Sequence, residues 1–549
     1  MLSPQASALA SVNRRSDSHG RGRGREQGWT TAILWIVGAF VVRTLLASLV
    51  PLLPDETYYW EWTRRLEAGY FDHPPGVALL VRLGTLLVGD TTAGVRAGPA
   101  IAALVTHAAA TVLAWQFAGR GRDGASAAAR AAALVALVPL ATLGLVLATP
   151  DAALFATAML ALLGVERALA APLRSWRSTG WWTVAGIALG GAFVAKYTAV
   201  LLPMGLVIAC IVHPALRARF REAGPWLASA IALALFAPVV VWNILNEWIS
   251  FRFQLGHGFN PGARGNPLTR ELELVGGQVG LASPVLFVLM AIAIIVALRD
   301  GWSERNTTRP TDPSARRFAF GVIAAVPMLF FAISAWRRPV EANWPALIYP
   351  GAIVLLATSR EGWARGRAWR IGLGIAAVLL VVVSLQAWRP LLPLAPRKDP
   401  IARAHGWAEL AAATGVAMRD PFLNGTVDRW TAADRYQDAS ELAFHMPGQP
   451  TVFALNLGGR PNQYDLWPTA YEKVRPGDGL VVVFDDNPAG DALAARVATW
   501  FAESKRGPSV ALKRGAGEVA HRTIWLYRIA RDVPPRATTL PQLTPPTPK

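Results

Sequence analysis

Cysteine is almost absent from this chain, since Cys210 is the only one in 549 residues. A single thiol excludes an internal disulfide and a thiol-rich metal site. Charged residues are also scarce, at 16%, whereas 53% of the residues are hydrophobic. This balance excludes an ordinary soluble composition and is typical of an integral membrane protein.

The chain also lacks a basic stripe of the kind that binds nucleic acid, although its formal net charge is +18 at pH 7. Its arginines are scattered between apolar segments, and no stripe combines them with interleaved aromatics. Membrane topology explains the positive charge better. Nucleic acid is therefore not expected as a partner.

Apolar runs long enough to cross a bilayer recur up to about Trp388 and then stop. Because a transmembrane helix needs about 20 mostly apolar residues, the runs predict a polytopic α-helical membrane protein with about eleven transmembrane helices. Their predicted centres are Val41, Val105, Leu140, Leu160, Leu189, Val207, Leu235, Met290, Val326, Ile353 and Val381. Residues 1–28 are polar and Arg-rich with no small-residue cleavage site, so we expect a disordered cytoplasmic tail rather than a signal peptide.

The arginines sort the polar links between these runs into two alternating sets. The Arg-rich set comprises residues 14–25, 120–130, 174–177, 217–221, 299–317 and 360–370. Because cytoplasmic loops carry an excess of Lys and Arg, we expect these links and the N-terminus in the cytoplasm. The opposite, outer set comprises residues 55–75, 149–151, 196–197, 246–267 and 336–343 and, with an odd helix count, everything after Trp388. The main candidate reactive residues fall in this outer set, which places the predicted site on the outer face of the plasma membrane.

Residues 54–76 form the densest group of carboxylates and aromatics in the chain. Asp55 and Glu56 directly follow an apolar run. A carboxylate in this low-dielectric position gains basicity and can take the proton of an attacking hydroxyl. The alternative for Asp55 is an N-cap of a helix over Glu56–Ala68. Asp72 and His73 precede two prolines that hold them in extended backbone, where Asp72 can orient a substrate and His73 can contact a phosphate or a metal, or both can belong to a plain turn.

Further candidates lie at or inside the membrane margin. Asp151 follows Thr-Pro between two apolar runs, a position where an ionisable group is costly to insert, and helix capping is its alternative. Lys196 can hold an anionic lipid phosphate or extend its ammonium to the interface. Arg337 and Arg338 suit bidentate phosphate contacts, with Glu341 and Asn343 beside them. His107 and Arg43 lie inside apolar runs, where we favour contacts within the helix bundle.

Five segments together resemble a known family. They are P-D-E-T-Y-Y-W-E-W, G-Y-F-D-H-P-P-G, T-P-D-A-A-L-F, A-K-Y-T-A and R-P-V-E-A-N-W-P-A. In this order they resemble the bacterial family 39 glycosyltransferases, which are related to the dolichyl-phosphate-mannose protein mannosyltransferases and to the aminoarabinose and galacturonic acid transferases of lipid A. The resemblance covers roughly residues 30–470. It implies a GT-C fold, a polyprenyl-monophosphate sugar donor and inverting transfer on the outer side of the membrane.

The resemblance also implies roles for residues. Asp55 resembles the base or acceptor-orienting acid, with Glu56 beside it, and Asp72 and Asp151 resemble acids that shape the acceptor and sugar pocket. The implied phosphate ligands are His73, where some relatives carry a lysine, Lys196, Arg337 and Arg338. The expected substrate-binding residues are Tyr58, Tyr59, Tyr197, Glu341, Asn343, Tyr436, Gln437, Gln463, Tyr464 and Asp465. The metal ligands are unknown, and a divalent cation stays an open alternative.

The segment after Trp388 alternates strand-like apolar runs, at residues 451–455, 480–484 and 524–529, with helical runs at 434–445 and 491–501. This alternation predicts a small extracytoplasmic α/β domain. The expected division is a tail at 1–28, a transmembrane catalytic domain at 29–388, the α/β domain at 389–533 and a disordered Pro/Thr-rich end at 534–549. Asp485 and Asp486 end a strand and suit a turn or cap better than a cation site.

The function predicted from these observations is transfer of a sugar from a polyprenyl-phosphate donor to an envelope acceptor, which can be a lipid, glycan or protein hydroxyl. The alternative is a transporter or flippase of lipid-linked sugars. Against that alternative, the cytoplasmic side has no matching acid cluster and no inverted repeat is visible. A non-catalytic membrane scaffold is a third class.

Overall fold

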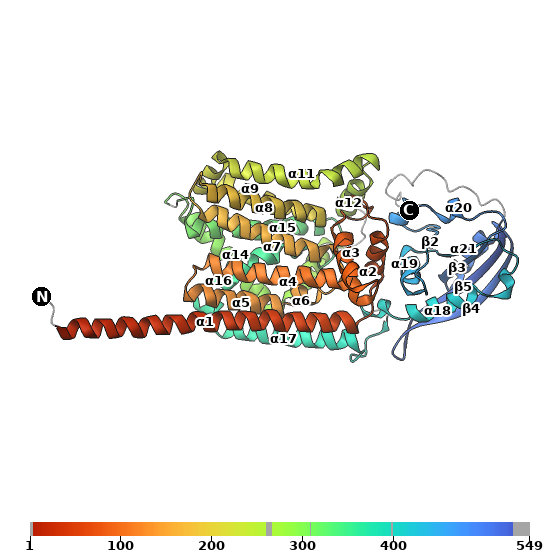
Figure 1. The fold of residues 1–549 in the computed structure, drawn as a ribbon, viewed down its shortest axis with the longest axis horizontal. Helices are drawn as coiled ribbons and strands as arrows, with labels where there is room; N and C mark the ends of the chain where they lie inside the picture. Colours follow the sequence, from red (N-terminus) through yellow and green to blue (C-terminus); the bar gives the residue numbers. More distant parts are fainter. Residues whose placement is uncertain (1–3, 260–265, 308, 397–398, 531–549) are drawn as a thin grey trace.

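The computed structural model describes residues 4–259, 266–307, 309–396 and 399–530. Figure 1 shows a bundle of long helices with a smaller sheet-containing domain, here called the tail domain, at one end. The expected disordered segment 534–549 lies outside the described residues. Residues 4–28 belong to the same helix as the first apolar run rather than to an irregular tail. The domain boundaries stay a prediction.

The bundle is built from helices that differ widely in length. The main ones are α1 (Pro4–Leu49), α4 (Thr92–Phe117), α5 (Arg122–Leu137), α6 (Pro139–Leu143), α7 (Pro150–Ala170), α8 (Trp176–Ala195), α9 (Leu201–Val212), α11 (Ala223–Leu245), α13 (Pro267–Ala282), α14 (Pro284–Ser303), α15 (Pro313–Ala335), α16 (Ile348–Thr358) and α17 (Arg367–Trp388). Short elements connect them: α10 (Pro214–Arg217) and the 3₁₀ helices η1 (Tyr197–Val200), η2 (Ala218–Arg221), η3 (Trp344–Leu347) and η4 (Gly362–Ala364). Proline is the first residue of α7, α13, α14 and α15, where its fixed φ suits the helix and its missing N–H costs no hydrogen bond.

Among the described residues, seven helices are long and apolar enough to cross a membrane: residues 24–49 of α1, α4, α7, α11, α14, α15 and residues 362–388. The pair formed by residues 197–212 and 214–221, bent by 109°, raises the number to as many as eight. The chain is therefore a multi-pass membrane protein, and the predicted count of about eleven spans is not confirmed. All eleven predicted centres lie in helices of the bundle, but the helix that contains Leu140, α6, has only five residues.

The helix predicted around Leu140 is wrong. The chain leaves helical geometry at Val138, before Pro139, and only the five-residue α6 follows. Proline removes one backbone donor and clashes with the preceding turn, which explains the break. Arg43 of α1 binds carbonyls on both sides of it, those of Val135 at 3.0 Å and Ala141 at 2.8 Å. Arg43 therefore makes contacts within the helix bundle, the role that the sequence favoured for it.

Three short helices lie between the bundle and the tail domain: α2 (Pro54–Thr63), α3 (Gly76–Val88) and α12 (Ile249–Phe259) (Figure 1). We call this end of the bundle the tail end. The opposite end, where α8 and α11 begin, is the far end. A helix was expected here only in the alternative for Asp55, over Glu56–Ala68, and α2 begins two residues earlier and ends at Thr63. The residues of α2 are almost all buried and show no amphipathic pattern that would predict it.

The tail domain contains one five-stranded sheet with the order β2-β1-β3-β5-β4. The strands are β1 (Arg429–Ala433), β2 (Val452–Ala454), β3 (Gly479–Asp485), β4 (Phe501–Arg514) and β5 (Gly517–Ala530), with β1 parallel to β2 and β3, and β5 antiparallel to β3 and β4. The helical elements are α18 (Trp407–Ala417), α19 (Tyr436–His445), α20 (Ala470–Lys473), α21 (Pro488–Ala498), η6 (Ala402–Ala404), η7 (Pro421–Leu423) and η8 (Gln463–Asp465). Three of these strands and two of the helices fall where the sequence predicted them.

One face of the sheet shares a hydrophobic core with the bundle. Val481 and Ile524 of the sheet and Leu442 of α19 pack in the same buried cluster as Tyr58 of α2 and Val81 of α3. The other face is covered by α21 in a separate cluster. The tail domain is therefore packed directly onto the tail end of the bundle.

Candidate active site

Asp72 lies at the centre of the contact between the bundle and the tail domain. It is buried, and the Tyr58 hydroxyl donates to its Oδ2 at 2.8 Å. Its Oδ1 is 3.0 Å from Nη1 of Arg460, an arginine of the tail domain. Burial raises the pKa of Asp72, while Arg460 and the Tyr58 hydrogen bond oppose that rise. Both of its carboxylate oxygens are thus engaged by donors.

Asp55 has a different environment. It lies in the first turn of α2, two residues after the N-cap Leu53, so it is not the cap. The positive helix end favours a carboxylate there. Within the described part of the chain, its half-buried carboxylate makes no hydrogen bond or ion pair. Burial raises its pKa, with Arg403 opposing and Asp72 adding to the shift. An unoccupied carboxylate of raised basicity is suited to take a proton.

Glu56, expected beside Asp55 as a second acid, is fully buried and fully occupied. Arg96 of α4 binds it with Nε at 2.8 Å and Nη2 at 2.5 Å. The backbone N–H groups of Leu53 and Ala148 donate to it, each at 2.9 Å. With four donors on two oxygens, Glu56 ties α2 to the bundle and positions Asp55.

Asp151 and Lys196 form a second polar group at the tail end. Lys196 Nζ lies 2.8 Å from Asp151 Oδ1, and the Asn343 amide donates to Oδ2 at 2.9 Å. Asp151 is in the first turn of α7, and Lys196 directly follows α8. Asp151 is not the N-cap of α7, which is Thr149. Lys196 is buried, so its ammonium does not extend to the interface.

Gly76 allows the loop that carries Asp72 to lie next to the Asp151–Lys196 pair. A Cβ at Gly76 would lie 2.7 Å from Cα of Ala195, so only glycine allows the loop after Asp72 to pack against the residue before Lys196. Tyr59 is close enough to both sets of acids to respond to their charge. Burial raises the pKa of Tyr59 well above the usual range, and the carboxylates of Asp55, Asp72 and Asp151 raise it further. The structure therefore brings all four predicted acids and Lys196 into one region.

The remaining predicted phosphate ligands lie around this region with fewer contacts. His73 is half-buried, with its ring centroid 6.2 Å from that of Tyr59. Arg338 Nη1 donates to the Gly256 carbonyl of α12 at 3.0 Å, and Gln254 of the same helix donates to the Asp72 carbonyl at 2.5 Å. Arg337 and Glu341 are exposed. Arg338 is thus linked to Asp72 through α12, whereas no contact links Arg337 or Glu341 to the acids in the described part of the chain.

The predicted substrate-binding tyrosines form an aromatic group around Asp72. The Tyr58 ring centroid lies 4.6 Å from that of Tyr436 and 6.1 Å from that of Tyr464. The Tyr436 hydroxyl accepts from Arg460 Nη2 at 2.9 Å. Tyr197 lies apart from them, with its hydroxyl 2.8 Å from the Ser250 hydroxyl.

The predicted tail residues Gln463 and Asp465 have mainly docking contacts. The Gln463 backbone N–H donates to the Tyr58 hydroxyl at 2.7 Å, and its side-chain Oε1 accepts from the Phe71 N–H at 2.7 Å. Asp465 accepts from the Asn456 amide and the Asn462 N–H inside its own loop. Gln437 is half-buried in α19.

Sequence reasoning missed the arginine that completes the site. Arg460 follows two glycines and precedes a proline, and its guanidinium lies 5.2 Å from the Phe253 ring and 5.3 Å from the Tyr436 ring. Arg96 and Arg403 were also missed. The only sequence signal for Arg460 is its place in a Gly-Gly-Arg-Pro loop, which does not reveal that Asp72, 388 residues away, is its partner.

Among the described residues, no group of three His, Cys, Asp or Glu side chains is placed to hold a metal ion. Asp485 pairs with Arg435 and Arg522, and Asp486 pairs with Arg506. These two carboxylates form ion pairs within the tail domain, and the cap of the following helix α21 is Asn487. The open alternative of a divalent cation is left without a site in this part of the chain.

The multi-pass bundle with a small α/β domain at one end agrees with the class that the sequence predicted, a glycosyltransferase embedded in the membrane. The family model described as dolichyl-phosphate-mannose-protein mannosyltransferase matches residues 72–242. Lipid A galacturonosyltransferase RgtD of Rhizobium johnstonii is 26% identical over 450 residues, which cover 79% of this chain and 86% of that protein.

Solved structures agree on the fold. ArnT of Cupriavidus metallidurans in its apo state superposes with a TM-score of 0.59 at 16% identity, covering 91% of this chain and 98% of that chain. The same protein bound to undecaprenyl phosphate gives a TM-score of 0.58 at 15% identity, covering 90% and 97%. The resemblance to the bacterial family 39 glycosyltransferases is confirmed, and the chain is a glycosyltransferase of the inner membrane.

Proposed function

We propose that the protein transfers a sugar from a polyprenyl-monophosphate donor to a lipid acceptor on the outer face of the membrane, with inversion at the anomeric carbon. The donor class is supported by the undecaprenyl phosphate bound to ArnT, and the acceptor class by the name of the lipid A galacturonosyltransferase RgtD. By the same analogy we take galacturonic acid as the first sugar to test.

The observation that carries this proposal is Asp55, a half-buried carboxylate whose pKa is raised by burial and which has no hydrogen-bond partner in the described part of the chain. In the proposed reaction the acceptor hydroxyl oxygen forms a bond to the anomeric carbon, and Asp55 takes the hydroxyl proton. The bond between that carbon and the phosphate oxygen breaks at the same time. Polyprenyl phosphate leaves with the electron pair.

Lys196 is the proposed first ligand of the donor phosphate. It is buried, and in the described part of the chain its ammonium pairs with one carboxylate, that of Asp151. A phosphate can therefore join the pair as a second anion beside the ammonium. The amide of Asn343 already donates to Asp151 and would fix that carboxylate while the phosphate binds. We assign His73 and Arg338 to the rim of the same phosphate site.

The tail domain is proposed to cover the sugar site on the side that faces away from the helix bundle. Tyr436 and Tyr464 provide ring faces beside Tyr58, and aromatic faces suit the apolar face of a sugar. Gln437, on the same helix as Tyr436, is the proposed polar contact. For this arrangement to act on an outer acceptor, the N-terminus must be cytoplasmic and the tail domain extracytoplasmic, as the positive-inside rule predicts.

The test compares Asp55→Asn with Lys196→Ala in the full purified chain, using undecaprenyl-phosphate-galacturonic acid as donor and lipid A as acceptor, with the product measured by mass spectrometry. Asp55→Asn should lower turnover by at least ~100-fold while donor binding stays within error, because loss of a general base costs about 10²–10⁴-fold. Lys196→Ala should instead weaken donor binding, since a hydrogen bond to a charged group contributes roughly 1.5–3 kcal/mol.

Asp428→Asn, an exposed carboxylate in the tail domain, is the matched control and should leave both quantities unchanged. Normal turnover of Asp55→Asn with every tested donor would remove Asp55 as the base. A donor that binds but is never transferred by the wild type would refute the proposed sugar without affecting the role of Asp55.

A further inference from the structure

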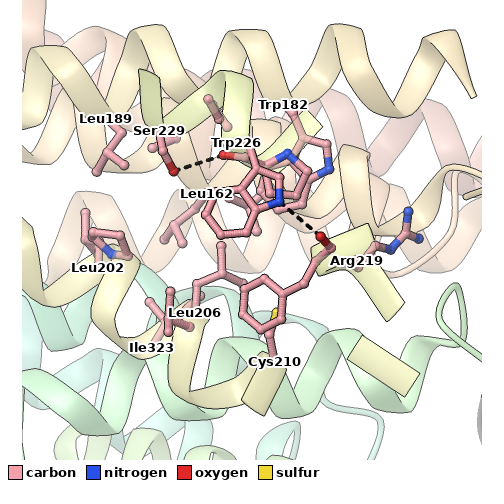
Figure 2. Close-up of a pocket in the computed structure, with 18 of the residues that line it drawn as sticks. Leu162, Trp182, Leu189, Leu202, Leu206, Cys210, Arg219, Trp226, Ser229 and Ile323 are labelled. Atoms are coloured by element: carbon pink, nitrogen blue, oxygen red, sulfur yellow. Dashed lines mark hydrogen bonds between the residues drawn. The ribbon is translucent and has the colours of Figure 1, made fainter. Parts of the chain in front are cut away.

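A cavity of about 460 Å³ lies between helices of the bundle (Figure 2). Trp182 and Trp226, which line it, are near the starts of α8 and α11 and so near the far end. Its walls come from α7, α8, α9, η2, α11 and α15, and apart from Arg219 and Ser229 they carry apolar or weakly polar side chains. Mostly apolar cavities of about 300–1,000 Å³ are typical of sites that hold one ligand. The catalytic proposal uses none of these residues.

The mouth of the cavity faces the surface that lipid surrounds. Leu162 and Ile323 form a buried inner wall, whereas Val207, Ile211 and Trp226 line the cavity and are exposed, Trp226 by 62%. These three lie on α9 and α11, which belong to segments apolar enough to cross a membrane. The available occupant of an apolar cavity that opens sideways into a bilayer is a hydrocarbon chain.

One end of the cavity is basic. The bent pair turns by 109° at His213, and the segment after the bend places Arg219 and Phe220 in the cavity wall. Arg219 is neutralised by Glu222 at 2.8 Å, but Arg217 and Arg221 on either side of it are exposed. The Trp226 indole donates to the Phe220 carbonyl at 3.0 Å and holds this segment over the cavity.

Two tryptophans place this end at the depth of lipid head groups and esters. Trp226 and Trp176 are both largely exposed, and tryptophan is enriched where the membrane meets water. Trp182, in the cavity wall, is 3% exposed, and its indole N–H has no hydrogen-bond partner in the described part of the chain. A buried donor of this kind normally has a partner, and a lipid ester carbonyl would supply one.

We propose that this cavity binds an anionic phospholipid, with one acyl chain inside it, an ester carbonyl accepting from Trp182, and the phosphate at Arg217 and Arg221. Basic pockets between transmembrane helices are known sites for anionic head groups. The polyprenyl tail of the donor is the competing source of a hydrocarbon chain. It fits less well, because Lys196, the proposed ligand of the donor phosphate, lies at the opposite end of α8 from Trp182. The two residues are 14 positions apart in sequence, or about 21 Å along a helix.

The experiment uses the full chain in detergent, exchanged into phosphatidylglycerol or phosphatidylcholine of equal acyl length, with retained lipid counted by native mass spectrometry. Wild type should retain phosphatidylglycerol in preference. Arg221→Gln should lower its retention about fivefold, the effect of one basic residue near an anionic membrane surface, without changing that of phosphatidylcholine. Arg370→Gln, an exposed arginine near the start of α17, should change neither.

Filling the cavity should displace the chain. Ser229→Trp should lower retention of both lipids, by about fourfold for each acyl-chain methylene group that the new side chain excludes from the cavity. Leu233→Trp, one turn further on α11 and exposed outside the cavity, should have no effect. Where Ser229→Trp does not yield folded protein, Val207→Trp on the other side of the mouth replaces it. Equal retention of the two phospholipids by wild type, or cavity filling that lowers only the binding of undecaprenyl phosphate, overturns the proposal; neither outcome depends on transfer activity.

Discussion

Arg460 is the residue through which the tail domain reaches the acids, and its replacement gives the sharpest test of the site. Arg460→Gln removes the cation 3.0 Å from the Asp72 carboxylate and 2.9 Å from the Tyr436 hydroxyl but keeps a side chain that can hydrogen-bond. Asp72 then stays buried with the Tyr58 hydroxyl as its remaining side-chain donor. Its pKa, already raised by burial, must rise further because an opposing positive charge is lost.

The size of the effect follows from the exposure of the pair. Hydrogen bonds to charged groups contribute roughly 1.5–3 kcal/mol, and the Arg460 side chain is 45% exposed, so solvent screening favours the lower end. About 1.5 kcal/mol corresponds to roughly a tenfold loss of transfer near neutral pH. If Asp72 acts as a carboxylate, activity is lost as pH falls through its pKa. The acidic limb of the pH–rate profile should therefore move to higher pH in Arg460→Gln, and raising the pH should restore part of the rate.

The assay is the transfer reaction with undecaprenyl-phosphate-galacturonic acid, followed across the pH range in wild type, Arg460→Gln and Arg460→Lys. Lysine keeps the charge and should return the acidic limb toward the wild-type position. Arg435→Gln removes an exposed arginine of the same domain that pairs with Asp485, and it should leave the profile unchanged. A tenfold loss of rate with an unmoved acidic limb would show that Arg460 acts on packing alone and would refute the electrostatic reasoning.

Two further predictions concern the frame of the site and its sidedness. Glu56→Gln leaves Arg96 as a buried, unpaired cation, which costs about 3–5 kcal/mol, so the temperature of thermal unfolding should fall strongly. The control Glu409→Gln, on the exposed side of α18, should not change that temperature. Normal stability with lost transfer would instead make Glu56 a proton-transfer group. Reporter fusions after Trp388 should be active only with an extracytoplasmic reporter, and fusions at Arg365 only with a cytoplasmic one. The reverse pattern would place the tail domain in the cytoplasm and exclude transfer on the outer face.

The sequence predicted which polar residues gather at the tail end of the bundle better than it predicted the helices and contacts that hold them. Asp55, Asp72, Asp151 and Lys196 stood out because each is a polar group next to an apolar run or a proline, a local signal. Arg460 did not stand out, because its significance depends on a contact 388 residues away in sequence. The pairing of Glu56 with Arg96 was missed for the same reason, and Glu56 was therefore expected to act beside Asp55.

The helix count shows the same limit. Apolar runs report how much of the chain is hydrophobic, but not where a helix ends. Pro139 ends one predicted span early, and His213 and Pro214 bend another by 109°. The hydrophobic periodicity did not reveal α2, because its polar and aromatic residues are almost all buried and show no apolar face. Within the tail domain, β2, β3 and the second half of β5 were predicted because each is a run of mostly buried apolar residues. The strands β1 and β4 were not predicted.

The hydrophobic core that Tyr58 and Val81 share with Val481 and Ile524 makes the two parts of the molecule a single cooperative unit at their contact. Separating them would expose apolar surface on both, so neither is expected to keep its full stability alone. The tail domain is consequently a poor candidate for exchange between relatives as an independent module. A new acceptor specificity would have to arise by substitutions that respect both sides of this core, which ties the evolution of the extramembrane surface to that of the helices beneath it.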